Sequence, residues 1–422
     1  MTVFLRILFC IACLATFARA GDWPQWRGPE RTGHVPAGVA VPRELPLTPK
    51  GVWHVPLTDG VSSPVVAGGN VICLDNRQNK ESVHAFDAAT GKMLWSAELD
   101  DIHKDSQSKP GPRCTPLVDG DRVYAQSCRG ELQCLALADG KVVWRTNYVK
   151  DFGATFMGEK GNAPGATRHG YNGSPLIYGD HLIAEVGGQG AAFVCFDKLT
   201  GKVIWKSQNE VPAYAPPIIA NVAGARQLIA FMVEGVVAID PTDGKLLWQV
   251  PLKTALGRHA TTPVVVDDMV VVASHQIGLI GIKVTKEGSA FKADRAWTAK
   301  ESAINFSSPV AVGGYLYGLG PNKNLVCVDT QTGKQTWSKD GFSGTDGGHA
   351  HAGIIVMGEN LLILTDNGQL ALAAADPKAY REISRIQVCG QNWCNPAYAD
   401  RNLYLRDARE LWRIQLMASP ND

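Results

Sequence analysis

The chain repeats one short phrase along most of its 422 residues. In each copy an apolar stretch leads into a turn that contains Gly-Lys, and a tryptophan follows the glycine by four residues. The copies are FDAATGKMLW (86–95), LALADGKVVW (135–144), FDKLTGKVIW (196–205), IDPTDGKLLW (239–248) and VDTQTGKQTW (328–337). Repetition this regular indicates an architecture in which each copy belongs to one structural unit.

Each unit is predicted to contain four antiparallel strands. The apolar segments on both sides of the glycine turn predict a β-hairpin, in which glycine supplies a positive φ and an acid such as Asp87 accepts hydrogen bonds from turn amides. Upstream lies a second hairpin that starts with small residues and proline, as in SSPVVAGGNVICL from Ser62. Proline is tolerated as the first residue of a strand, where its missing N–H need not join the ladder.

The number of units follows from the prolines that mark their starts. These are Pro64, Pro116, Pro175, Pro217, Pro263, Pro309 and Pro396. The interval between Pro309 and Pro396 is long enough for two units. Its second unit starts at Ala352, lacks the proline and the tryptophan, and keeps the strand pattern. The final unit, from Cys394, stops after three strands, and GVWHVPL (51–57) resembles a fourth strand such as LLWQVPL (246–252).

The predicted fold is therefore all-β: an eight-bladed β-propeller of four-stranded antiparallel blades over residues 51–417, closed by an N-terminal strand that completes the last blade. Seven tryptophans lie in the predicted fourth strand of their units, at equivalent positions. We expect these side chains to pack between blades rather than to bind a substrate. They are Trp53, Trp95, Trp144, Trp205, Trp248, Trp297 and Trp337.

The two ends of the chain lie outside the repeats. Residues 1–20 combine a basic Arg6, the apolar run ILFCIACLATF and the sequence ARA before Gly21, which predicts a cleaved secretory signal that is too short to anchor the protein stably in a bilayer. Acylation at Cys13 is the alternative, although CIAC lacks the usual Leu three residues earlier. We expect an exported protein of the periplasm or cell envelope, with an N-terminal extension over 21–50 and a tail over 418–422.

Charge and cysteine usage fit an exported monomer. Loss of Arg6 and Arg19 from the 41 basic residues leaves 39 against 40 acidic ones, so no strong field attracts nucleic acid or an anionic membrane. An oxidising compartment permits disulfides. The spacing allows two pairs, Cys114 with Cys128 and Cys389 with Cys394, and equally allows free thiols. Three further cysteines at one equivalent strand position are predicted to be buried apolar side chains: Cys134, Cys195 and Cys327.

The repeated phrase, read as A/F-x-D-x-x-T-G-K-x-x-W around an eight-unit ring, closely resembles the pyrroloquinoline-quinone (PQQ) repeat of quinoprotein alcohol dehydrogenases and of the outer-membrane assembly factor BamB. The segment DWPQWRGPERTG (22–33) also resembles the opening of a large group of exported, BamB-like bacterial repeat proteins. The resemblance implies the propeller fold. It implies either a binding or scaffold module that uses loops on one face, or a dehydrogenase that holds PQQ and calcium.

The dehydrogenase alternative is the weaker of the two. Those enzymes resemble one another in an adjacent Cys-Cys pair, in acidic and Asn ligands for calcium and in a catalytic Asp. This chain has no Cys-Cys dipeptide, no matching ligand set and no C-x-x-C-H for a covalent haem. We therefore favour a binding or scaffold module and assign no catalytic residue. PQQ-dependent oxidation of an alcohol or sugar is the alternative.

A binding site is expected at one mouth of the central channel, where the segments that precede the innermost strands converge. The candidates are Arg113, Arg168, His169, Tyr171, Arg258, His259, Asn305, His349, His351 and Trp393. Arginine and histidine beside aromatic rings suit a carboxylate, a phosphate or a polyanionic sugar, or else a protein partner. The alternative is an ordinary solvated channel. His349 and His351 are too few to predict a metal site.

Overall fold

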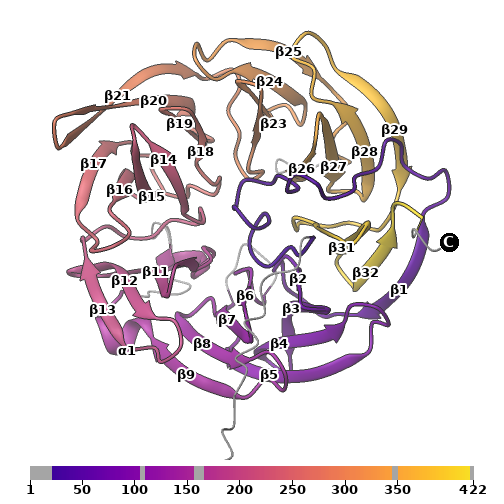
Figure 1. Cartoon of the computed structure of the whole chain (residues 1–422), viewed down its shortest axis with the longest axis horizontal. Helices are drawn as coiled ribbons and strands as arrows, with labels where there is room; N and C mark the ends of the chain where they lie inside the picture. Colours follow the sequence, from indigo (N-terminus) through magenta and orange to yellow (C-terminus); the bar gives the residue numbers. More distant parts are fainter. Residues whose placement is uncertain (1–20, 105–109, 156–165, 345–349, 419–422) are drawn as a thin grey trace, which may run out of the picture.

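The computed structural model describes residues 21–104, 110–155, 166–344 and 350–418. Within this part of the chain, eight four-stranded antiparallel sheets stand around a central channel (Figure 1). The sheets follow one another in sequence order, and the innermost strands of neighbouring sheets lie side by side. The predicted all-β, eight-bladed propeller is confirmed.

The strands are given blade by blade, from the channel outward. Blades 1 to 4 comprise β2 (Val65–Ala67), β3 (Asn70–Arg77), β4 (Lys80–Asp87), β5 (Met93–Asp101); β6 (Leu117–Asp119), β7 (Arg122–Gln126), β8 (Glu131–Ala136), β9 (Val142–Asn147); β10 (Leu176–Tyr178), β11 (His181–Gly188), β12 (Ala191–Asp197), β13 (Val203–Ser207); and β14 (Ile218–Val222), β15 (Ala225–Met232), β16 (Gly235–Ile239), β17 (Leu246–Pro251).

Blades 5 to 8 comprise β18 (Val264–Val266), β19 (Met269–Ser274), β20 (Gly278–Glu287), β21 (Ala290–Ala299); β22 (Val310–Val312), β23 (Tyr315–Leu319), β24 (Leu325–Asp329), β25 (Gln335–Lys339); β26 (Ala352–Met357), β27 (Asn360–Thr365), β28 (Gln369–Ala374), β29 (Arg381–Gln387); and β30 (Ala397–Ala399), β31 (Asn402–Arg406), β32 (Glu410–Gln415), β1 (Lys50–Pro56). Two short helices, α1 (Tyr148–Phe152) and α2 (Ala166–His169), lie between blades 2 and 3.

The ring closes as the sequence predicts. Strand β1 is the outermost strand of blade 8 and pairs antiparallel with β32, so that Trp53 faces Arg413 (Figure 1). The Leu57 amide extends the pairing by donating to the Arg409 carbonyl at 2.7 Å. Because the two ends of the repeat region share one sheet, neither end leaves an open blade edge within the ring.

Every outermost strand carries a β-bulge beside the tryptophan position. In blade 1, for example, Trp95 pairs with Ala85 and Met93 pairs with Phe86, which leaves Leu94 as the extra residue. A bulge bends the exposed edge and makes it a poor template for pairing with another chain. The residue that pairs with the tryptophan is small in six blades: Ala85, Cys134, Cys195, Ala238, Gly281 and Cys327.

Most of the blade tryptophans also contact the next blade. The indole of Trp144 donates to the Lys198 carbonyl of blade 3 at 3.0 Å, and its ring lies against Gly201 in the Thr-Gly-Lys turn, where a Cβ added to the glycine would approach within 2.5 Å. Equivalent contacts pair Trp53 with Gly91, Trp95 with Gly140, Trp205 with Gly244 and Trp297 with Gly333. The repeated glycine thus allows both the turn, at a φ near +70°, and the approach of the indole.

Two junctions depart from this pattern. Trp248 donates to Gln227 of its own blade at 2.6 Å. Blade 7 has Ser384 at the tryptophan position, and its hydroxyl accepts a hydrogen bond from the Leu45 amide of the N-terminal extension at 2.9 Å. The N-terminal extension therefore contributes to the junction between blades that the repeat leaves without an indole.

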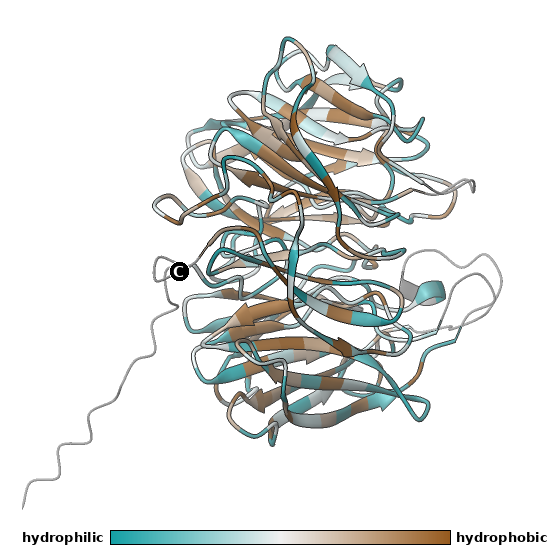
Figure 2. Ribbon diagram, turned by 90° about the vertical axis from the view of Figure 1, so that its right-hand side faces the viewer, coloured by the Kyte–Doolittle hydropathy of each residue, from teal (hydrophilic) through white to brown (hydrophobic). Residues whose placement is uncertain are grey.

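The apolar core lies between neighbouring blades: one cluster, for example, joins Leu132 and Trp144 of blade 2 to Leu182 and Phe196 of blade 3. Figure 2 shows brown, apolar segments along the strands of the ring. No helix in the described residues is long and apolar enough to cross a membrane. All eight cysteines in this part of the chain are free thiols. Neither suggested disulfide is formed. The Cys114 thiol donates to the Tyr171 carbonyl, that of Cys128 to the Gly111 carbonyl and that of Cys389 to the Gly390 carbonyl.

Candidate functional site

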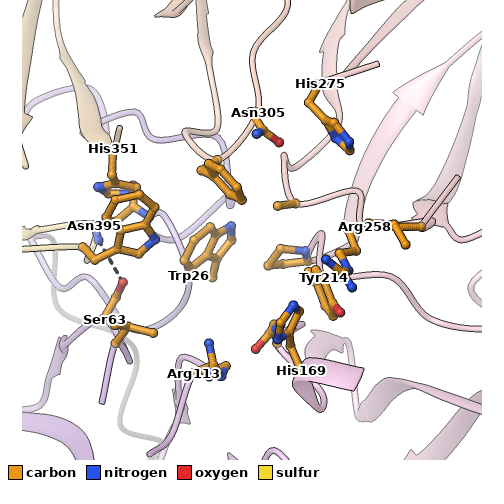
Figure 3. A pocket seen from close by; sticks show the side chains of 17 residues that line it. Trp26, Ser63, Arg113, His169, Tyr214, Arg258, His275, Asn305, His351 and Asn395 are labelled. Carbon is orange, nitrogen blue, oxygen red and sulfur yellow. Dashed lines mark hydrogen bonds between the residues drawn. The ribbon is translucent and has the colours of Figure 1, made fainter. Parts of the chain in front are cut away.

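A cavity of about 590 Å³ lies at one mouth of the channel and is called the cup below (Figure 3). Every blade supplies a lining side chain from the segment just before its innermost strand. In blade order these include Ser63, Arg113, His169, Tyr214, Arg258, Asn305, His351 and Trp393. The convergence follows from the fold, because the same loop of each blade points to the same end of the channel.

Six of the ten predicted site residues line the cup. They are Arg113, His169, Arg258, Asn305, His351 and Trp393. His349 lies outside the described residues. The remaining three, Arg168, Tyr171 and His259, are buried and are not among the residues that line the cup.

The side chains of Tyr171 and His259 pack inside the blades. Tyr171 packs edge-on against Tyr148 at 5.1 Å, and its hydroxyl donates to the Val186 carbonyl at 2.8 Å. The His259 ring stacks on Phe231 with centroids 3.9 Å apart. Arg168 is 5 % exposed, while the adjacent His169 reaches the cup. Neighbouring loop residues point in different directions, and the sequence does not say which one faces the channel.

Other residues also line the cup. Asn172 and Tyr214 belong to the loops that the sequence places at the channel mouth, so those loops already indicate them. His275 comes from the connection between β19 and β20 and gave no sequence signal. Trp26 comes from the N-terminal extension, and its only signal was its place in the DWPQWRGPERTG motif.

The N-terminal extension crosses the channel and supplies Trp26 to the cup (Figures 1 and 3). Its backbone pairs with the innermost strands of the two blades that flank blade 8: Trp23 exchanges two hydrogen bonds with Val66 of blade 1, and Val35 donates to Val356 of blade 7. The Trp26 indole donates to Thr262 of blade 5 at 2.8 Å. The extension is therefore part of the site as well as of the fold.

Two buried arginines fix the extension in place. Arg27 donates to the Pro309 carbonyl at 2.6 Å, and Arg31 donates to the carbonyls of Pro175 and Ser174 at 2.9 and 3.0 Å. Burial lowers the pKa of both guanidinium groups to about 9, and the charge of Glu185 opposes the effect at Arg31. Marker prolines of the repeat thus present their carbonyls to the arginines of the DWPQWRGPERTG motif.

The cup is cationic and has no carboxylate among its described lining residues. Burial raises the pKa of Tyr214 to about 12, while the positive charges of Arg258, Arg113 and Arg168 act in the opposite direction. All three arginines are therefore close enough to Tyr214 for their positive charges to act on its hydroxyl. Burial lowers the pKa of His351 to about 4, so this imidazole is neutral at physiological pH.

A smaller cavity of about 290 Å³ adjoins the cup and shares Val61, Arg113 and Trp393 with it. It is lined by two carboxylates, Asp59 and Asp407. Asp407 accepts hydrogen bonds from the Gly390 amide and the Trp412 indole, among others, so it has a structural role in this loop. These two carboxylates thus belong to the smaller cavity and do not line the cup.

Comparison with known proteins identifies the family. The family model for the outer membrane protein assembly factor BamB matches residues 48–155, 79–339 and 303–381, which span most of the propeller. The chain belongs to this BamB family. It is 22% identical to BamB of Yersinia pestis over 316 residues, covering 70% of this chain and 72% of that protein. It is 26% identical to BamB of Burkholderia pseudomallei over 262 residues, covering 56% of this chain and 67% of that protein.

Solved structures share the propeller of this BamB-family chain. BamB from Moraxella catarrhalis aligns with a TM-score of 0.57 at 16% identity, covering 87% of this chain and all of that one. Quinohemoprotein alcohol dehydrogenase from Comamonas testosteroni aligns with a TM-score of 0.64 at 14% identity, covering 95% and 82%. At these identities the likeness concerns the fold alone, and it does not decide between scaffold and enzyme.

The residues of the cup do not fit calcium-bound PQQ. Calcium in proteins is held by several oxygen ligands, with carboxylates prominent among them. The cup offers arginines, histidines and asparagines, and no cluster of three or more His, Cys, Asp or Glu side chains occurs within the described residues. A cation would also lie beside Arg113 and Arg258, whose charges repel it.

Proposed function

We propose that this BamB-family propeller is an exported scaffold or binding module of the cell envelope, which receives its ligand or a projecting segment of a protein partner in the cup. The observation that carries the proposal is the convergence of side chains from all eight blades and from the N-terminal extension on one cavity. A site built from every unit of a ring is rigid, which lowers the entropic cost of binding.

The relatives support the scaffold part of the proposal. The family description and the curated relatives are named for the assembly of outer membrane proteins, a task that requires contact with other proteins. The predicted secretory signal over residues 1–20 supports export to the same compartment. The quinoprotein alternative shares only the fold, and the donors of the cup do not suit its calcium ion.

Site-specific photocrosslinking tests the location of the binding face. A photoreactive amino acid is placed at His275, which is exposed and lines the cup, in the full chain produced with its own leader. The control position is Arg226, which is exposed near the start of β15, beside the turn that follows β14 and at the other end of β14 from Tyr214. We expect adducts from His275 that disappear when Arg113 and Arg258 are both changed to Ala. Adducts from Arg226 alone would place binding on another face.

Two further measurements complete the test. N-terminal sequencing of the protein from the envelope fraction is expected to give Gly21, and a chain that keeps residues 1–20 in the cytoplasm would contradict export. Titration with PQQ and calcium is expected to leave the thermal stability unchanged. Tight, calcium-dependent binding of PQQ would replace the scaffold proposal with the oxidoreductase.

A further inference from the structure

The cup has two chemically different walls. Arg113, His169, Tyr214 and Arg258, from blades 2 to 5, form the cationic wall, and Phe306, His351 and Trp393, from blades 6 to 8, form the aromatic wall. Trp26 of the N-terminal extension lies between His351 and Arg258 in Figure 3 and adds its indole to the aromatic wall. Within the aromatic wall, the rings of Phe306 and Trp393 lie 5.8 Å apart, and those of His351 and Trp393 lie 5.5 Å apart. A ligand that fits both walls needs an anionic group and a ring with a flat, weakly polar face.

Two buried polar atoms specify the rest of the ligand. The Asn172 Oδ1 and the His351 Nδ1 lack a hydrogen-bond partner within the described residues, and both side chains line the cup. His351 is only 3 % exposed. The amide oxygen can only accept, and a neutral imidazole has one donor and one acceptor nitrogen, so both sites are satisfied by groups that donate and accept, such as hydroxyls.

These demands exclude the simpler anions. Inorganic phosphate pairs with the cationic wall but leaves most of a 590 Å³ cavity and the aromatic wall without contact. An aromatic acid covers the aromatic wall but brings no hydroxyls to Asn172 and His351. A sugar ring presents an apolar C–H face to an indole and hydroxyls around its edge, and a carboxylate or phosphate on the ring completes the match.

We propose that the cup binds an acidic sugar, with its carboxylate or phosphate on Arg113 and Arg258, its ring against Trp26 and Trp393, and its hydroxyls on Asn172 and His351. The proposal rests on the proposed function, since it names the ligand class of the same binding cup. It also gives the N-terminal extension a direct role, because Trp26 belongs to no blade.

Calorimetric titration of the mature protein tests each part of this ligand. The probes are glucuronate, glucose 6-phosphate, glucose, benzoate and inorganic phosphate at equal ionic strength. We expect the two acidic sugars to bind, and the other three to bind about tenfold more weakly or not at all. Glucose loses the charge-assisted hydrogen bonds, benzoate loses the hydroxyl contacts, and inorganic phosphate loses both the ring and the hydroxyls. The ratio of glucuronate to glucose 6-phosphate affinity distinguishes a carboxylate source from a phosphate source.

Variants assign the roles of individual residues. Arg258→Ala is expected to lower the affinity for both acidic sugars about tenfold or more, and the exposed Arg226→Ala serves as the matched control without effect. Trp393→Ala tests the stacking face without touching the N-terminal extension, and Trp26→Ala tests the extension itself. Thermal denaturation of each variant separates lost binding from lost folding.

Different failures have different meanings. Benzoate binding as tightly as glucuronate overturns the hydroxyl contacts, and glucose binding as tightly overturns the anionic contact. If none of the sugars binds while crosslinks from His275 persist, the acidic sugar is wrong and the scaffold remains. If sugar binding and crosslinks are both absent, the proposed function fails as well.

Discussion

The junctions between blades and the cup are built from the same repeat in opposite ways. At the junctions one residue type recurs: an indole from one blade lies on the turn glycine of the next, as with Trp95 on Gly140 and Trp144 on Gly201. In the cup each blade contributes a different side chain from the equivalent loop. The comparison teaches that recurrence marks the residues that hold the ring together, whereas divergence at an equivalent position marks the residues available for recognition.

Removing a junction tryptophan is expected to have the largest effect. Trp144 is 8 % exposed, and its indole contacts Tyr124, Phe196 and the Gly201 turn. Trp144→Ala leaves a cavity between blades 2 and 3 and is expected to lower the free energy of unfolding by about 3–5 kcal/mol. Urea denaturation followed by circular dichroism measures the loss. An unchanged midpoint would mean that the junction contacts do not stabilise the ring.

The turn glycine gives a sharper test of the same junction. Gly201 and Gly179 both lie in hairpin turns of blade 3, at φ values of +71° and +60°, but a Cβ meets Trp144 at 2.5 Å in the first and no atom within 4 Å in the second. Both Gly→Ala variants incur the ~1–2 kcal/mol cost of a left-handed alanine, and Gly201→Ala incurs ~1–3 kcal/mol more from overpacking. Equal melting temperatures for the two variants would contradict the role of the indole.

The fold was predictable because its rules are local and repeated. Hairpin turns, strand periodicity and the tryptophan position gave the eight blades, and the likeness of 51–57 to a fourth strand gave the closure. The site was predictable only as a location. The loops before the innermost strands identified Arg113, Arg258 and His351, but not whether His259 or its neighbour Arg258 faces the channel. Trp26 was missed because a non-repetitive segment has no equivalent position from which its place in the channel can be inferred.

The burial of His259 leads to a prediction about how stability depends on pH. Burial against Phe231 lowers the pKa of His259 to about 4 from a usual value of 6.5, so the unfolded chain binds a proton more readily than the folded one between these values. The stability from neutral His259 is therefore complete above pH 6.5 and is lost as the pH falls toward 4.

We expect His259→Leu to flatten the dependence of the melting temperature on pH between 6.5 and 5. His275→Gln, at an exposed position of the cup, is the matched comparison: the charge of His275 adds only a small part to the lowered pKa of His259, so this variant is expected to keep most of the slope of the parent protein. An unchanged slope in His259→Leu would mean that His259 is accessible to protons, as a residue facing the channel would be.

The smallest effect on stability is expected from a tryptophan of the cup. Trp393 is partly exposed and contacts other members of the aromatic wall, Phe306 and His351, but no turn glycine. Trp393→Ala is expected to change the free energy of unfolding by about 1 kcal/mol or less, because water already reaches the ring and can fill the space it leaves. The same urea experiment that measures Trp144→Ala measures this variant. A loss of unfolding free energy as large as that of Trp144→Ala would show that the cup also holds the ring together. The distinction between recurring structural residues and divergent recognition residues would then fail in the ligand-binding cup itself.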